Sequence, residues 1–331
     1  MVYEVNLRGL FSRDAIARQL KALPPLETPV LDTFFPARPQ HSFPLLGIEE
    51  IIRIAKARPM VRRGSAAVNI GGNDLAFNFI EPMPIRLSVG VTGQALNNLK
   101  LLKPEDRDGW ASRQTEGFRL DVRATSEAVA SQSIAGKISW PVQLENGGWD
   151  TYEVDFGTPS QFEPTTFFDA QGAGIRDVHK CCLGMKKVLQ KAGYGGSIEI
   201  WAGEDAFNQL LALAEGFQST AQFIVQIAES AINVAGFVIK LRAEEYQNPR
   251  TGAYAPVVAA DKMVMGTKLS DRPLFFCALD DLDSNLVAMP LFVKPIKRDE
   301  PSGWLLVCES KPFPVPVIKS FCWATVLGGG A

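Results

Sequence analysis

Residues Pro104 to Lys137 constrain the fold more than any other segment, because they read as one very long helix. Glu105 and Asp106 stand in its first turn, where they suit the positive end of the helix dipole. At 1.5 Å per residue this helix would be about 50 Å long, roughly three times the ordinary length. Gly109 and Gly117 are the positions where a bend or break is expected.

The apolar side of this helix is narrow and consists of Phe118, Val122 and Val129. Such a stripe cannot bury much of a long helix in its own core. We therefore expect most of the helix to be left uncovered by its own chain. The second half carries mostly small side chains: Ala124, Thr125, Ser126, Ala128, Ala130 and Ser131.

The segment from Ala22 to Leu46 combines six prolines with aliphatic and aromatic side chains. Proline is excluded from helix interiors and central strands, whereas large apolar side chains favour burial. We therefore expect an extended arm that lies against another surface, which a second subunit could supply. The candidate inter-subunit contacts on this arm are Leu31, Phe34, Phe35 and Phe43.

A projecting hairpin is predicted before the long helix. Val61 to Ile70 and Leu75 to Ile80 flank a Gly-Gly-Asn-Asp tip, and Ile85 to Val91 follows as a further strand. Its apolar content is low, so it is expected to project. Basic residues of this region are expected to contact acidic groups of a partner subunit rather than nucleic acid. They are Arg58, Arg62, Arg63 and Arg86.

After the long helix the pattern predicts a second hairpin and then an α/β body. The hairpin pairs Lys137 to Leu144 with Trp149 to Phe156 across a turn at Asn146-Gly147-Gly148. Helices are predicted at Gly174 to Lys191, Glu204 to Glu215 and Ala221 to Ile232. Strands are predicted at Ser197 to Trp201, Ala235 to Leu241, Lys262 to Gly266, Pro273 to Leu279, Trp304 to Ser310 and Ile318 to Val326, with an edge or sheet switch at Pro312, Pro314 and Pro316.

Composition excludes several classes of protein. Of the 331 residues, 46% are hydrophobic, which argues against disorder, and 34 basic residues nearly balance 36 acidic ones. The chain therefore has no overall field that would draw it to nucleic acid or an anionic membrane. The first twenty residues do not resemble a secretion signal, and Phe223 to Leu241 is too polar for a membrane span. Five cysteines without a C-x-x-C motif fit reduced thiols in a cytoplasm.

Candidate catalytic and metal-binding residues are few. Only His41 and His179 are present, which nearly excludes a histidine metal cluster or a paired-histidine mechanism. Cys181 and Cys182 lie next to His179 in sequence, but adjacent helical residues point about 100° apart. Core packing is therefore the favoured interpretation of the two cysteines, and we expect no catalytic, metal or cofactor site.

Three short motifs resemble ligand loops without completing them. Gly172 to Asp177 begins like a dinucleotide fingerprint but ends in aspartate and follows no predicted strand. Gly136-Lys137 lacks the remaining residues of a phosphate loop and reads as a helix end. Asp280, Asp281 and Asp283 begin like a calcium loop, but the glycine and the glutamate of that loop are absent, which favours a solvated acidic turn.

The order of short motifs along the chain resembles the major capsid protein E family of tailed bacteriophages, which contains the lambda-like head proteins. The first motifs are in the arm, Leu31 to Pro36, and beside the projecting hairpin, Ala57 to Gly64 and Phe79 to Ile85. The later ones are Tyr152 to Gly157, Tyr246 to Pro256, Met263 to Gly266 and Glu309 to Phe313. Thr158 to Gln171 departs from the family, because phenylalanines stand where a tryptophan is expected.

The resemblance implies an α+β chain with the Hong Kong 97 phage capsid fold. That fold consists of an N-arm, an extended loop, a spine helix, a peripheral domain and an axial domain, which is the order of the elements predicted above. Its divisions would be the arm at 1–57, the extended loop at 58–95, the spine helix and peripheral hairpin at 96–158, a mainly axial part at 159–290 and returning C-terminal strands at 291–331.

The resemblance further implies a major capsid protein that self-assembles into the icosahedral shell of a tailed phage or prophage. Its partners would be copies of itself in hexamers and pentamers, together with scaffold, portal and decoration proteins. The shell would enclose double-stranded DNA without sequence-specific binding, after assembly as a procapsid in the bacterial host cytoplasm. The alternatives are a cellular nanocompartment shell of the same fold and a soluble α/β enzyme with a site around Gly172 to His179.

Overall fold

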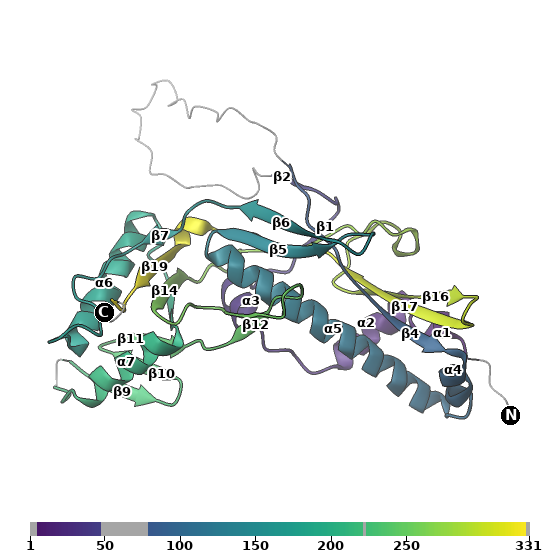
Figure 1. Ribbon diagram of the computed structural model, residues 1–331, viewed down its shortest axis with the longest axis horizontal. Helices are drawn as coiled ribbons and strands as arrows, with labels where there is room; N and C mark the ends of the chain where they lie inside the picture. The colour runs from purple at the N-terminus through teal and green to yellow at the C-terminus, as the bar shows by residue number, and fades with distance from the viewer. Residues whose placement is uncertain (1–4, 48–78, 221–222, 329–331) are drawn as a thin grey trace, which may run out of the picture. The chain divides into compact units, whose positions relative to one another are not determined.

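The computed structural model describes residues 5–47, 79–220 and 223–328, which form two compact units (Figure 1). Most of the predicted projecting hairpin, including its Gly-Gly-Asn-Asp tip, lies outside the described residues, and so do Arg58, Arg62 and Arg63. The first unit comprises Met1–Leu45, Glu81–Ala130 and Ser270–Val315, and the second comprises Leu46–Ile80, Ser131–Leu269 and Pro316–Ala331.

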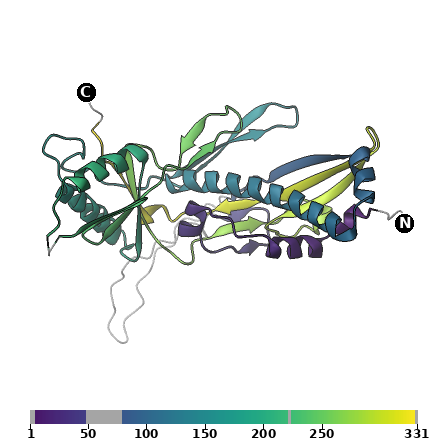
Figure 2. The same cartoon turned by 90° about the horizontal axis from the view of Figure 1, so that it is seen from below.

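The long helix is α5, Pro104–Ile134, and it is continuous for 31 residues (Figures 1 and 2). Neither Gly109 nor Gly117 interrupts it, so the expected break is absent. The expectation that its second half is uncovered is wrong. Four of the six small side chains there are buried, with exposures of 3% at Ser126, 2% at Ala128, 0% at Ala130 and 3% at Ser131, whereas Ala124 is exposed. Side chains of this size can pack closely against neighbouring elements.

The first unit contains a three-stranded antiparallel sheet, in the order β16, β17, β4. It packs with short N-terminal helices and one side of α5 in a single apolar cluster that includes Phe11, Phe118 and Leu306. The strands are β4 (Ile85–Thr92), β16 (Phe292–Arg298) and β17 (Gly303–Ser310), and the helices nearby are α1 (Leu7–Leu10), α2 (Arg13–Ala22) and α4 (Gly93–Lys100).

A second small sheet of this unit contains the extended part of the arm, in the order β1, β15, β18. β1 (Gln40–His41) pairs in parallel with β15 (Leu274–Cys277), and β18 (Pro312–Pro314) pairs with the other side of β15. The prolines of β18 therefore lie on an edge strand, as the sequence predicted, because an edge strand tolerates the missing amide donors.

A seven-stranded mixed sheet is the centre of the second unit. Helices α6 (Ile175–Lys191) and α7 (Glu204–Glu215) share one apolar core with it, as their predicted positions required. In spatial order the strands are β7 (Ser160–Gln161), β19 (Phe321–Thr325), β14 (Lys262–Thr267), β8 (Ile198–Ala202), β11 (Phe237–Leu241), β10 (Ala231–Val234) and β9 (Val225–Ala228).

The helix predicted at Ala221 to Ile232 is wrong, because β9 and β10 form an antiparallel hairpin there. The run is rich in β-branched side chains, which fit a pleated sheet better than a helix. The second predicted hairpin is confirmed as β5 (Lys137–Gln143) and β6 (Trp149–Asp155). Shorter pairs are β2 (Leu46–Gly47) with β3 (Phe79–Ile80) and β12 (Glu245–Gln247) with β13 (Tyr254–Pro256).

Within the described ranges, the structure has no helix that is both long enough and apolar enough to cross a lipid bilayer.

Candidate assembly surface

The predicted arm is folded onto its own chain rather than left exposed. Leu31, Phe34 and Phe35 each have 0% exposure, and the first two belong to a short helix, α3 (Pro29–Phe34). The guanidinium of Arg272 lies 5.7 Å from the Phe34 ring and 5.8 Å from the Phe35 ring, and it donates a 3.0 Å hydrogen bond to the Phe34 carbonyl. These three side chains are therefore buried within their own chain, and their predicted contact with another subunit stays a prediction.

Glu127 of α5 holds the N-terminus of α3 in place. Its two carboxylate oxygens accept hydrogen bonds from the backbone amides of Val30, at 2.6 Å, and Leu31, at 3.0 Å. These amides belong to the first turn of α3, where amides lack partners within the helix. Burial raises the pKa of Glu127, and the two backbone hydrogen bonds oppose that rise. The arm is therefore fixed by charge and by packing within one unit.

Two of the predicted contact residues remain candidates for contacts between copies. Phe43 is 67% exposed, near the end of the arm. Arg86 on β4 has a side chain that is 60% exposed, and its Nε lies 3.2 Å from the Oε2 atom of Glu309 on the neighbouring strand. Both residues can therefore be reached from outside the chain, so their role between subunits stays a prediction.

Other large apolar side chains are far more exposed than a solitary chain requires. The most exposed of the described residues are Leu101 at 85% and Leu282 at 83%. Ile224 and Ile227, beside and within the edge strand β9, are about half exposed. Exposed apolar groups and unpaired strand edges favour association with another chain. The surface therefore offers several places where a neighbouring copy could be bound.

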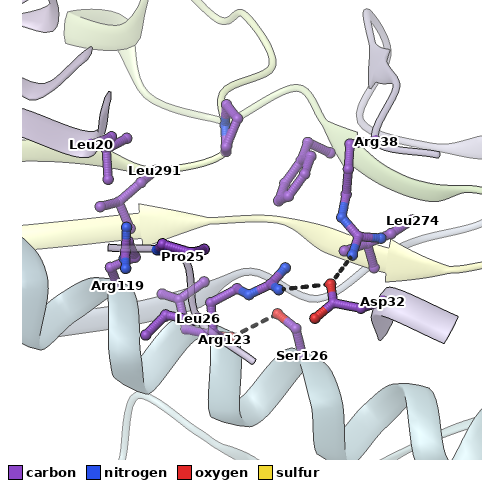
Figure 3. Close-up of a pocket in the computed structure, with 13 residues that line it drawn as sticks. Leu20, Pro25, Leu26, Asp32, Arg38, Arg119, Arg123, Ser126, Leu274 and Leu291 are labelled. Atoms are coloured by element: carbon purple, nitrogen blue, oxygen red, sulfur yellow. Dashed lines mark hydrogen bonds and ion pairs between the residues drawn. The ribbon is translucent and has the colours of Figure 1, made fainter. Parts of the chain in front are cut away.

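A cavity of about 440 Å³ lies beside α5 in the first unit (Figure 3). Arg38, Arg119 and Arg123 line it together with one acidic residue, Asp32. The Asp32 Oδ1 atom lies 3.2 Å from Arg38 and 3.3 Å from Arg123, so the two guanidinium groups share one carboxylate. Burial and the nearby charge of Arg123 lower the pKa of Arg38. Sequence reasoning missed this cavity, because its residues come from separate segments of the chain.

The candidate nucleophiles are buried in apolar surroundings, as the core-packing interpretation predicted. Burial raises the pKa of Cys181 to about 12, and it raises the pKa of the fully buried Cys182 well above its ordinary value. The His179 ring packs edge-on against Phe223, at 5.3 Å, and Phe237, at 5.5 Å. Cys181, Cys182 and Phe237 belong to one apolar core, and the raised pKa values keep the two thiols protonated at neutral pH.

The ligand-like motifs serve structural roles. The Gly174 amide donates a 3.1 Å hydrogen bond to Asp177, so the end of the fingerprint-like run caps α6. Gly136 lies two residues after the end of the long helix, with φ of +104°, as expected of a helix end.

The acidic turn is held by lysines. Asp281 lies 2.6 Å from the Lys294 ammonium, and Asp280 lies 3.2 Å from Lys311. Asp283 is a second partner of Lys294, at 3.0 Å. Within the described ranges, no group of three or more His, Cys, Asp or Glu residues is arranged to hold a metal ion.

A family model described as phage major capsid protein E matches residues 12–326. The chain belongs to the phage major capsid protein E family. The family resemblance inferred from the short motifs is thus confirmed, and so is the function of a major capsid protein that forms an icosahedral shell. The location in the virion capsid follows from the same membership.

Two solved structures of low sequence identity are similar to this chain over most of its length. A putative capsid protein of a prophage from E. coli CFT073 is similar over 97% of this chain and 99% of its own, with a TM-score of 0.59 and 16% identity. A phage-related protein from Bordetella bronchiseptica RB50 has a TM-score of 0.49 at 10% identity, over 96% of this chain and 98% of its own. The first likeness confirms the predicted α+β capsid fold. A comparison with curated protein sequences gave no match.

Proposed function

We propose that this capsid subunit assembles into hexamers and pentamers that close around double-stranded DNA, with no enzymatic activity of its own. The observation that carries the proposal is the family match over nearly the whole chain. Scaffold, portal and decoration proteins would be further partners, and assembly would take place as a procapsid in the cytoplasm of the bacterial host. The exposed apolar side chains described above support repeated contacts between copies.

The charge balance supports containment of DNA rather than tight binding. The sequence carries 34 basic and 36 acidic residues, so a shell built from it has a nearly neutral wall. A strongly basic wall would bind phosphate groups tightly and with a steep dependence on salt. Retention of DNA would instead depend on the contacts between subunits, which in permanent assemblies bury more than about 2,000 Å².

Sedimentation of the purified full-length chain, followed by electron microscopy and nucleic-acid analysis, tests this proposal. We expect closed shells, rings or sheets that exchange with smaller oligomers as salt is varied. Particles from phage-infected or induced cells should protect double-stranded DNA from nuclease. Shells that enclose protein cargo instead would favour a cellular nanocompartment, and a chain that stays monomeric in every condition would contradict both readings.

A substrate screen tests the absence of enzymatic activity. We expect no turnover from the purified chain. If any turnover is found, it should survive the combined change of His179→Ala and Cys181→Ala, because these residues pack in the core. Loss of a measured turnover in this variant, with the fold unchanged by circular dichroism, would contradict the proposal.

A further inference from the structure

The cavity beside α5 is short of negative charge. Of the described residues that line it, three are arginines and one is acidic (Figure 3). Asp32 already pairs with Arg38 and Arg123, whereas Arg119 donates to the carbonyl of Pro24, a neutral acceptor. The buried Nε of Arg119 has no hydrogen-bond partner among the described residues. A buried donor without a partner is costly, so an acidic occupant would be stabilised here.

Apart from Ser126, the remaining wall of the cavity is aliphatic and aromatic. Leu20 and Leu26 come from the N-terminal segment, Val122 from α5, and Leu291 directly precedes β16. An occupant that satisfies both parts of the wall must combine an apolar side chain with carboxylates close by. A free inorganic anion would leave the apolar wall uncovered. A purely aliphatic group would leave the charge of Arg119 without an anionic partner.

Two exposed leucines of this chain are candidates for the apolar group, and charge distinguishes them. Leu101, at 85% exposure, lies between Lys100 and Lys103, which the arginines would repel. Leu282, at 83% exposure, lies between Asp281 and Asp283. Asp281 is buried against Lys294, whereas the Asp283 side chain is 71% exposed and can be reached by a second cation. The leucine of the acidic turn therefore fits a cavity lined with arginines, and the leucine of the basic turn does not.

The acidic turn is already rigid in the single chain. Leu282 begins a one-turn 3-10 helix, and the Asp281 carboxylate accepts a 2.9 Å hydrogen bond from the Asp283 amide. The hydroxyl of Ser284 donates a 2.7 Å hydrogen bond to the Asp281 carbonyl. A turn held in this way presents its leucine with little further loss of conformational entropy on binding.

We propose that the acidic turn Asp280–Leu286 of one copy inserts Leu282 into the arginine cavity of a neighbouring copy. The inference rests on the proposed function, because it names one of the contacts that would hold the shell together. The two surfaces differ, so the contact is head-to-tail and, repeated by rotation, it closes rings. Leu282 is the apolar anchor, and the exposed carboxylate of Asp283 pairs with Arg119, which lines the cavity.

Leu282→Ala and its matched control Leu101→Ala give the first test. Both leucines are almost fully exposed, so neither change should affect folding. Leu282→Ala removes an apolar anchor that is buried at the interface, so it should raise the critical concentration for assembly about tenfold. Leu101→Ala should assemble like the wild type. Equal critical concentrations for wild type and Leu282→Ala, with wild-type shells present, would overturn the inference and leave the proposed function intact.

A charge exchange tests the pairing itself. Arg119→Glu and Asp283→Lys should each reduce assembly, and the double variant should recover it, because the attraction is restored with its sign reversed. Asp280 is left unchanged, since it pairs with the buried Lys311. Failure of the double variant to exceed either single variant, with all three folded by circular dichroism, would overturn the inference.

Disulfide trapping gives a readout that does not depend on closed shells. The five native cysteines are buried, so Pro25→Cys at the cavity rim and Leu282→Cys would be the reactive pair. Mild oxidation of the double variant should give a ladder of covalently linked copies on a non-reducing gel. The control pair, Pro25→Cys with Leu101→Cys, should give none. A disulfide formed only within one chain, or no ladder, would overturn the inference.

Discussion

Phe34→Ala tests whether the N-terminal arm is core of its own chain. The Phe34 side chain has 0% exposure, and its ring lies 5.7 Å from the Arg272 guanidinium. Loss of about 150 Å² of buried apolar area at about 25 cal/mol/Å² costs roughly 4 kcal/mol, within the range of about 3–5 kcal/mol for Phe→Ala in protein cores. Phe43→Ala is the matched control, because Phe43 is 67% exposed and its loss should change stability by about 0.5 kcal/mol or less.

Urea unfolding of the unassembled chain, followed by tryptophan fluorescence, measures the difference. For a slope of about 2 kcal/mol/M, the transition midpoint of the first unit should fall by about 2 M in Phe34→Ala and remain unchanged in Phe43→Ala. A Phe34→Ala chain with wild-type stability that fails to form shells would refute the reasoning. In that case Phe34 would be an interface residue, and the arm would belong to a neighbouring copy.

Three further predictions concern an ion pair, a glycine and the thiols. Lys294→Met removes the ammonium 2.6 Å from Asp281 and should cost about 1–3 kcal/mol. Burial raises the pKa of Asp281, but hydrogen bonds from Lys294 and the backbone outweigh burial, so the pKa is lowered. The stabilisation by the ion pair is therefore lost as pH falls through the lowered pKa. Between pH 7 and 3 the urea midpoint should fall less in Lys294→Met than in the wild type, and equal falls in the two proteins would contradict this prediction. In Gly136→Ala the new Cβ would lie 2.3 Å from the Gly157 carbonyl oxygen, whereas in Gly147→Ala it would meet no atom within 4 Å. The melting temperature of Gly136→Ala should therefore lie well below that of Gly147→Ala. Similar melting temperatures for the two variants would contradict this prediction. All five thiols should resist a thiol-reactive dye at pH 8 until urea is added, and fast labelling of the native chain would argue against their burial.

Local patterns predicted the regular elements well where one signal dominated. Helix α7 begins and ends where the sequence indicated, at Glu204 and Glu215, and α6 differs by one residue at its start. The Asn-Gly-Gly turn between β5 and β6 was equally clear. Strand β16 was missed because Pro295 and flanking charged residues obscure its alternation, which an edge strand tolerates.

Local sequence patterns did not predict the packing between distant segments of the chain. The prolines of the arm indicated an extended segment, whereas Pro29–Phe34 forms the short helix α3. Nothing local shows that Glu127, about a hundred residues away, accepts hydrogen bonds from Val30 and Leu31 of that helix. The small side chains of α5 indicated weak burial because they offer little area, whereas the structure uses them for close approach. The arginine cavity was missed for the same reason, since Arg38 and Arg119 meet only in the folded chain.

Single-particle cryo-electron microscopy of particles assembled from the full-length chain tests the central claim most directly. The account predicts a closed shell with five-fold and six-fold clusters, in which every subunit keeps Leu31, Phe34 and Phe35 beneath its own residues while Leu282 is covered by a neighbour. Discrete monomers at every protein and salt concentration would contradict the account.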